Sequence, residues 1–156
     1  MTSASSSSSF RHPLNLVLSA LLMLVSGSAL AELKLEGAHA WIRLAPPGAP
    51  MLAGYVELKN LGEQPLKLKG GQSGAFGFVE IHRTEEVDGI SRMRQVPLLE
   101  IAPGETVKLQ PGGMHLMLMR PTREFAEGAT VVIDILDQND EPLPVAFTVR
   151  REAPAD

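Results

Sequence analysis

The chain has 156 residues, with 14 basic side chains, 18 acidic side chains and 4 histidines, and its formal net charge is −4. No basic patch indicates binding to nucleic acid. The sequence contains no cysteine, which excludes a disulfide framework, a cysteine-type zinc site and a blue-copper electron-transfer site, because the last of these needs a thiolate.

The N-terminal segment has the pattern of an export signal. Residues 1–13 are polar and serine-rich, Arg11 supplies a positive charge, and Leu14–Val25 is an apolar run. That run has signal-peptide length and is too short for a comfortable membrane span. Ala29-Leu30-Ala31 is a small-x-small cleavage site, so we expect a signal peptide over residues 1–31, cleavage after Ala31 and a periplasmic location. An uncleaved N-terminal anchor is the alternative.

Removing residues 1–31 from the 156-residue chain leaves 125 residues, with 13 basic against 18 acidic side chains, because Arg11 is the one charge that is lost. This length suits one domain with a hydrophobic core. We expect that domain over residues 32–150 and a flexible tail over residues 151–156. The mature chain has no further apolar run that could span a bilayer.

The mature chain has the pattern of an all-β sandwich. Its apolar runs are short, rich in Val, Ile and Leu, and separated by Gly, Pro and Asn clusters at intervals of roughly 8–12 residues. The predicted strands are Ala38–Leu44, Ala53–Asn60, Leu66–Gly70, Phe78–Glu85, Ser91–Gln95, Thr106–Leu109, His115–Met119, Thr130–Asp137 and Val145–Arg150.

Between these strands, local chemistry predicts loops and turns. The segment Ala45–Pro50 contains three prolines and should form an ordered loop, because proline fixes φ and removes a hydrogen-bond donor. Asp88-Gly89 predicts a tight hairpin turn. Asp137–Asp140 begins like a calcium loop but lacks its glycine and distal glutamate, so a turn is expected there. Trp41 and Tyr55 alternate with apolar residues and are expected in the core.

His82 and Met93 are expected on the same face of a hairpin. Strand alternation places Phe78, Glu80, His82 and Thr84 on one face. If Asp88-Gly89 is a two-residue loop, His82 faces Gln95, and Met93 becomes a diagonal neighbour of His82 at a separation of about 7–8 Å. A three-residue loop would reverse this parity.

The segment Met114–Met119 carries a second group of potential ligands. His115, Met117 and Met119 share one face, while Leu116 and Leu118 lie on the opposite face, which is the natural core. Thioether sulfur and imidazole suit Cu(I) better than Zn, Mg or Ca, because soft donors select soft ions.

The candidate ligands can also be interpreted as ordinary packing or surface residues. A single strand methionine is more often core filler, and a single histidine is more often a surface residue. On this basis Met119 is expected to be edge packing, Met51 a loop anchor, and His39 a residue outside the site.

At these residues the chain resembles the PCuAC family of periplasmic copper chaperones. The family pattern is a histidine, ten residues, a methionine, twenty-one residues, then histidine-x-methionine, and His82, Met93, His115 and Met117 match every spacing. Further family-like stretches lie at Ala40–Arg43, Ala45–Pro50, Ala53–Tyr55 and Pro111–Met119. Arg83 is a departure, since the family often has methionine there, and Met114 replaces a frequent tyrosine.

The resemblance implies a cupredoxin-like Greek-key β-sandwich that binds one Cu(I) through His82, Met93, His115 and Met117. It implies a chaperone, not an enzyme, that delivers copper to a respiratory cytochrome c oxidase, either directly to a subunit or through a thiol-bearing assembly protein. We expect a shallow site with neutral ligands and no buried carboxylate. Thioethers do not titrate, so release by acid would require protonation of His82 and His115.

Three other functions remain open. The protein could sequester copper for resistance without a specific acceptor, although one site on 125 residues is poor storage. It could be a metal-free β-sandwich assembly module whose methionines only pack. A copper enzyme is disfavoured, because the chain lacks a third well-placed histidine for an oxygen-activating site.

Overall fold

The computed structural model describes Met1 and residues 34–155. The predicted signal peptide and its cleavage site after Ala31 lie outside the described residues. Within residues 34–155, no helix has the length and apolar character needed to cross a membrane.

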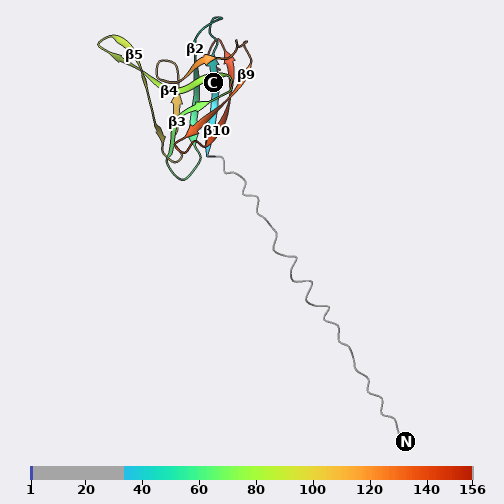
Figure 1. Cartoon of the computed structure of the whole chain (residues 1–156). Coiled ribbons are helices and arrows are strands. Elements are labelled where there is room, and N and C mark those ends of the chain that lie inside the picture. Colours follow the sequence, from blue (N-terminus) through green and yellow to red (C-terminus); the bar gives the residue numbers. More distant parts are fainter. Residues whose placement is uncertain (2–33, 156) are drawn as a thin grey trace. The chain divides into compact units, whose positions relative to one another are not determined.

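Ten strands form the described domain (Figure 1). They are β1 (Leu35–Arg43), β2 (Met51–Asn60), β3 (Leu66–Gln72), β4 (Phe76–Val87), β5 (Ile90–Gln95), β6 (Leu99–Ile101), β7 (Thr106–Leu109), β8 (Met114–Pro121), β9 (Thr130–Asp137) and β10 (Pro142–Arg150).

The strands pair in the order β5-β4-β8-β2-β1-β10-β9-β3-β6, and β7 pairs with β2. The path closes because β3 also pairs with β4, through Gly71 and Val79. All of these pairs are antiparallel except β1 with β10, which is parallel. The predicted all-β, cupredoxin-like β-sandwich is confirmed.

Nine of the ten strands were predicted, and most of them extend a few residues further than expected. The strand that sequence reasoning missed is β6, where Leu66 of β3 pairs with Ile101 and Leu68 pairs with Leu99. The three residues of β6, which lies between Pro97 and Pro103, are too few to show a period. Their burial against β3 is a tertiary effect.

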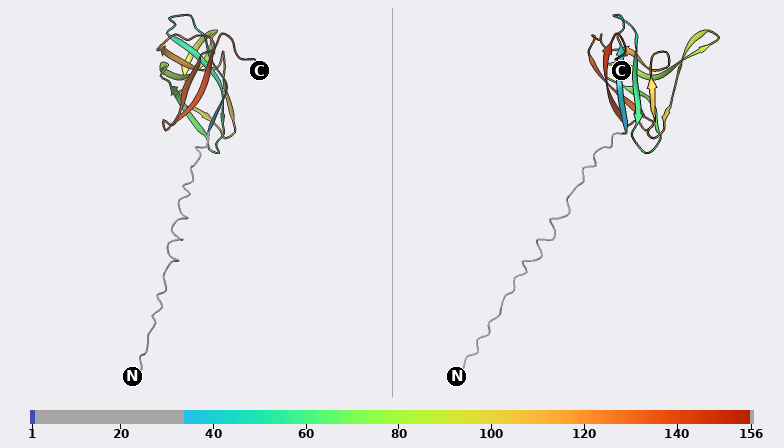
Figure 2. Two further views of the ribbon diagram at one scale, coloured as in Figure 1. Left: turned by 90° about the vertical axis from the view of Figure 1, so that its right-hand side faces the viewer. Right: turned by 180° about the vertical axis from the view of Figure 1, so that it is seen from behind.

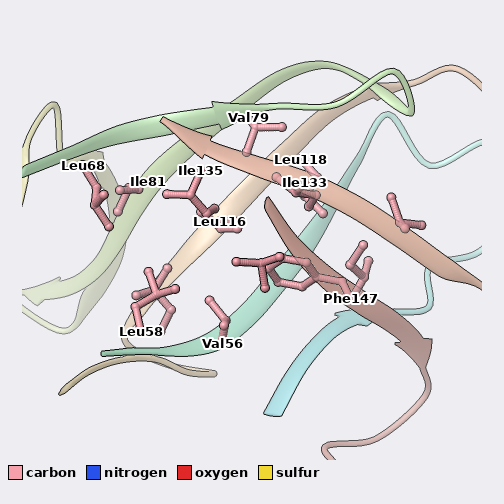
Figure 3. Packing of buried hydrophobic residues seen from close by; sticks show 14 of the residues in the cluster. Val56, Leu58, Leu68, Val79, Ile81, Leu116, Leu118, Ile133, Ile135 and Phe147 are labelled. Atoms are coloured by element: carbon pink, nitrogen blue, oxygen red, sulfur yellow. The ribbon is translucent and has the colours of Figure 1, made fainter. Parts of the chain in front are cut away.

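Alternation along the strands fills one shared core (Figure 3). On β4 the side chains of Val79 and Ile81 point inward, and on β8 those of Leu116 and Leu118 do so with no exposed surface. Since successive residues of a strand face opposite sides, the neighbours of these four residues are directed to the outer face. The core therefore decides which side chains of β4 and β8 are available to a ligand.

Trp41 and Tyr55 are buried as expected, yet they do not belong to the main core cluster. Their ring centroids lie 4.7 Å apart, and the Arg43 guanidinium lies 5.7 Å and 5.8 Å from the two centroids. The pair packs outside the main core cluster: Tyr55 alternates with the core residue Val56, and a bulge in β1 between Ala38 and Trp41 shifts the register of Trp41 against β2.

The predicted turns are confirmed. Val87 pairs with Ile90, so Asp88 and Gly89 form a two-residue loop, and both have positive φ (53° and 74°). These angles match the hairpin turns whose twist suits the flanking strands. Ala45–Pro50 connects β1 to β2 as a loop.

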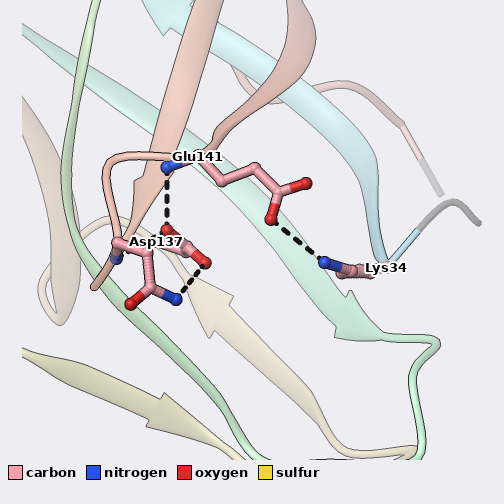
Figure 4. A network of polar contacts seen from close by, with 4 residues as sticks. Lys34, Asp137 and Glu141 are labelled. Atoms are coloured by element: carbon pink, nitrogen blue, oxygen red, sulfur yellow. Dashed lines mark hydrogen bonds and ion pairs between the residues drawn. The ribbon is translucent and has the colours of Figure 1, made fainter. Parts of the chain in front are cut away.

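The Asp137 turn is held by its own carboxylate (Figure 4). The backbone N–H groups of Asn139 and Glu141 donate to Asp137 Oδ1 at 2.7 Å and 2.8 Å, and Glu141 also pairs with Lys34 at 3.0 Å. Burial raises the pKa of Asp137, but these hydrogen bonds outweigh that effect and hold its pKa below the ordinary value. The segment is a structural turn.

The β4–β5 hairpin extends away from the other strands (Figures 1 and 2). Strand β5 is at one end of the pairing order and, among the described strands, pairs with β4 alone, and all six of its residues are exposed. Strand β5 therefore gains little from the core, whereas β4 contributes Val79 and Ile81 to it.

Candidate metal site

The candidate ligands lie on three neighbouring strands. In the order β5-β4-β8, His82 of β4 stands directly opposite His115 of β8 and opposite Gln95 of β5. Ile81 and Leu116 point into the core, so alternation directs both imidazoles to the outer face.

The two histidines form the centre of the site. Their ring centroids lie 6.1 Å apart with an interplanar angle of 42°. His115 is 5% exposed, and the His82 side chain is 15% exposed. Metal–nitrogen bonds of roughly 2 Å would let one ion sit between two rings at this separation.

Met117 lies beside this pair. It shares the outer face of β8 with His115, two residues away, and it stands opposite Glu80 of β4 and Ala53 of β2. Met117 is therefore diagonal to His82, at a distance that a long side chain can span. Its half-buried position shields the thioether from water on one side.

Met93 approaches from the other side of β4. It pairs with Thr84, which makes it the diagonal neighbour of His82 that the two-residue turn predicts. Unlike the other three candidates it is open to solvent, with 60% of its surface exposed. The structure thus brings all four predicted residues onto one face, but Met93 is far more exposed to solvent than the other three.

A partly exposed carboxylate lies next to His82, in addition to the four neutral ligands that the sequence predicts. Glu80 Oε2 is 2.9 Å from His82 Nε2, and the Glu80 side chain is 33% exposed. Alternation had already placed Glu80 on the face of His82, two residues away, and that was the signal available in the sequence.

The ring nitrogens of the two histidines have different surroundings. His82 Nδ1 is buried and has no hydrogen-bond partner within residues 34–155. His115 Nδ1 lies 3.3 Å from the carbonyl oxygen of Gly113, in the turn that precedes β8. Glu80 thus faces one ring nitrogen of His82, and the Gly113 carbonyl faces one ring nitrogen of His115.

The remaining candidates lie elsewhere. His39 is exposed in the bulge of β1, with φ of 52°, and is not brought to the site. Met51 and Met119 face each other across β2 and β8, and Met119 also stands opposite Phe78. The row formed by Met51 and Met119 lies next to Met117, at the end of the candidate site that is farthest from Met93.

Arg83, which departs from the family pattern, lies on the other side of the sheet. It pairs with Met114, and its Nη2 donates to Met114 Sδ at 3.6 Å. The guanidinium is therefore directed away from His82, as alternation predicts.

Among residues 34–155 there is no group of three or more His, Cys, Asp or Glu side chains that could hold a metal ion. The four candidate ligands on the outer face are two imidazoles and two thioethers. Such a set favours a soft monovalent ion over a hard divalent one.

A family model described as "Putative lipoprotein LpqE-like" matches residues 35–149, which is most of the chain. "Putative lipoprotein Lxx21020" of Leifsonia xyli subsp. xyli is 29% identical over 112 residues, covering 71% of this chain and 66% of the relative. The match thus spans just under two thirds of that relative's length.

Solved structures with the same fold include proteins described as PCuAC domains and as copper complexes. The Cu(I) form of DR1885 from Deinococcus radiodurans is 33% identical, with a TM-score of 0.58, covering 72% of this chain and 76% of that chain. The copper-bound PCuAC domain of PmoF2 is 21% identical, with a TM-score of 0.62, covering 78% and 94%. At that identity the second likeness concerns the fold alone.

Proposed function

The chain belongs to the LpqE-like family, and from that premise we propose that it is an exported Cu(I) chaperone that binds one ion per chain through His82, Met93, His115 and Met117. The Cu(I) form of DR1885, which is 33% identical to this chain, supports copper as the cargo. The lipoprotein descriptions of the relatives support export.

The observation that carries the proposal is the pairing of His82 with His115 on the outer face. Their rings lie 6.1 Å apart, and both are largely shielded from solvent. Met117 lies on the same face, and Met93 of β5 is a diagonal neighbour of His82. A sheet gains little by turning two imidazoles and two thioethers to one side for packing, whereas Cu(I) uses such donors.

The same arrangement suits a carrier. Cu(I) must be held well enough to suppress free-ion redox chemistry and must still pass to an acceptor. A donor set spread over a shielded strand and an exposed hairpin permits exchange of one ligand at a time. We propose that the acceptor is the copper centre of a respiratory cytochrome c oxidase, reached directly or through a thiol-bearing assembly protein, and that the chain has no enzymatic activity.

The first test is an anaerobic titration of the protein with Cu(I) in competition with a chromophoric chelator, with X-ray absorption on the loaded sample. We expect one equivalent, with both nitrogen and sulfur neighbours around copper. No binding at micromolar competition, or binding without sulfur scattering, would overturn the proposed site.

Delivery and sequestration of copper predict different phenotypes in a deletion strain. A strain that lacks this protein should lose oxidase activity when copper is scarce if the role is delivery. Copper sensitivity with normal oxidase activity would instead support sequestration. A strain carrying Met93→Leu and Met117→Leu distinguishes both from a metal-free assembly role, in which these changes would leave function intact.

A further inference from the structure

We propose that Glu80 is a positioning residue that fixes the tautomer of His82, so that His82 offers Nδ1 to the cargo ion while His115 offers Nε2. The part that concerns copper rests on the proposed function. The part that concerns the tautomer is a property of the metal-free protein and can be measured by itself.

The first step is the contact between Glu80 and His82. Glu80 Oε2 and His82 Nε2 are 2.9 Å apart. An ionised carboxylate can only accept hydrogen bonds, so the imidazole nitrogen that faces it must carry the proton. In the neutral ring the other nitrogen, Nδ1, then holds the free lone pair.

The second step is the state of that lone pair. His82 Nδ1 is buried, and no group in the described part of the chain donates to it. Buried polar atoms in native proteins nearly always have a partner, because an unsatisfied one retains its full desolvation cost. An orphaned acceptor beside a second imidazole at 6.1 Å is a place where a cation would supply the missing partner.

The third step is the tautomer of His115, which is the opposite of that of His82. Its Nδ1 lies 3.3 Å from the Gly113 carbonyl oxygen. A carbonyl accepts and cannot donate, so Nδ1 of His115 carries the proton and its Nε2 is left as the free acceptor. The turn at Gly112 and Gly113, where Gly112 has φ of 80°, places this carbonyl against the ring.

Together these contacts orient both rings before copper arrives. Partners of this kind fix the tautomer and orientation of metal-binding histidines, and removing one typically costs 10–100-fold in metal affinity. Glu80 also stands opposite Met117. A negative charge on its carboxylate therefore lies next to the candidate ligands and attracts a monovalent cation. In this protein the side chain at position 80 thus belongs to the binding machinery without being a ligand.

The tautomer is measured on metal-free protein with ¹⁵N-labelled histidine, in alkaline buffer where imidazoles are neutral. Two-bond and three-bond couplings to the ring protons identify the protonated nitrogen. We expect His82 to carry its proton on Nε2 in the wild type. In Glu80→Ala the ring should show a mixture of the two tautomers, while Glu80→Gln, whose amide can accept or donate, should fall between them.

Glu86→Ala is the matched control. Glu86 lies on β4, four residues beyond His82 and on the same face, and it is exposed. Its removal changes the net charge by the same amount without touching the ring. We expect the wild-type tautomer in this variant, and amide spectra should show a native fold in all of them.

Cu(I) competition titrations complete the test. We expect Glu80→Ala to weaken Cu(I) binding 10–100-fold and Glu86→Ala to leave it unchanged. Equal affinities for the two variants, or a wild-type His82 protonated on Nδ1, would overturn the inference while leaving the chaperone function in place. A wild type that binds no Cu(I) would instead end the proposed function, and the metal-free spectra would still decide whether Glu80 fixes the ring.

Discussion

Strands β8 and β5 contribute to the same candidate site under opposite conditions. β8 lies between β4 and β2, its inward side chains Leu116 and Leu118 have no exposed surface, and His115 is 5% exposed. β5 pairs with β4 alone, and its Met93 is 60% exposed. His115 is therefore part of the packed sandwich, whereas Met93 lies on an exposed strand of the β4–β5 hairpin.

This difference indicates how a carrier can bind and still release its cargo. A ligand on a packed strand loses little freedom on binding, so it contributes strongly to affinity. An exposed methionine must be ordered when it binds, which costs free energy. An incoming thiol can also approach a bound ion most easily from this exposed side. We infer that Met93 is the ligand that an acceptor displaces at the start of transfer.

The largest effect is expected from the core of β8. Leu116→Ala removes a fully buried side chain between His115 and Met117 and should lower the free energy of unfolding by about 2–5 kcal/mol. Ile90→Ala on β5, where the side chain is 57% exposed, should change it by less than about 0.5 kcal/mol. Denaturant unfolding of both variants checks the comparison, and similar losses would remove the distinction between packed strand and exposed hairpin.

Asp137 provides a variant that weakens the fold without touching either part of the site. Asp137→Ala leaves two backbone N–H groups without their carboxylate and should cost about 1–3 kcal/mol. Cu(I) affinity should stay at the wild-type value. A parallel loss of affinity would mean that stability and binding cannot be separated in this chain.

The Asp137 effect should also depend on pH. Its pKa is lower in the folded protein than the ordinary value, so its stabilisation is complete well above the unfolded pKa of about 3.9 and is lost as the pH falls through and below that value. The gap in unfolding free energy between wild type and Asp137→Ala should therefore shrink below about pH 4. Urea unfolding at several pH values measures this, and a gap that widens in acid would contradict the assignment.

Ligands on β8 should dominate affinity. We expect His115→Ala and Met117→Leu each to weaken Cu(I) binding at least tenfold, which corresponds to about 1.4 kcal/mol, while the fold survives. Competition against a Cu(I) chelator gives the affinity, and circular dichroism gives the fold. Wild-type affinity in both variants would exclude these two ligands.

Met93→Leu should have a smaller effect on equilibrium affinity than either β8 variant. Its main effect should be on kinetics, with faster loss of Cu(I) to a small thiol, because the ligand that is displaced first is already absent. Stopped-flow transfer to a chromophoric acceptor measures the rate. An affinity loss larger than that of His115→Ala would reverse the proposed roles of β5 and β8.

The smallest effect is expected at the Met51–Met119 row. These methionines face each other beyond Met117, and we expect Met51→Leu and Met119→Leu to bind Cu(I) almost normally. A loss comparable to that of Met117→Leu would extend the site along β8 toward β2.

Much of the site could be predicted from the sequence because it depends on local rules. A two-residue Asp88-Gly89 turn sets the register of its hairpin, and the strand period of two then places Met93 on the side of His82. The same period separates His115 and Met117 from Leu116. These relations hold over short distances along the chain, and the structure confirms each of them.

Other features depended on contacts between distant segments. The direct pairing of His82 with His115 joins strands 33 positions apart, and no local pattern specifies that register. Strand β6 exists because Leu99 and Ile101 pair with β3, and Trp41 and Tyr55 pack outside the main core cluster, where a bulge in β1 shifts the register of Trp41 against β2.

The sequence by itself determined the all-β class, the turn types and the side of each strand on which the candidate ligands lie, because these follow from backbone geometry and the alternation of apolar residues. The tertiary structure decided how far each ligand is shielded, which strands meet, and which ring nitrogen of each histidine is engaged. Those properties arise from packing and hydrogen bonds between segments such as Glu80 with His82 and Gly113 with His115, and such contacts exist only once the sandwich has closed.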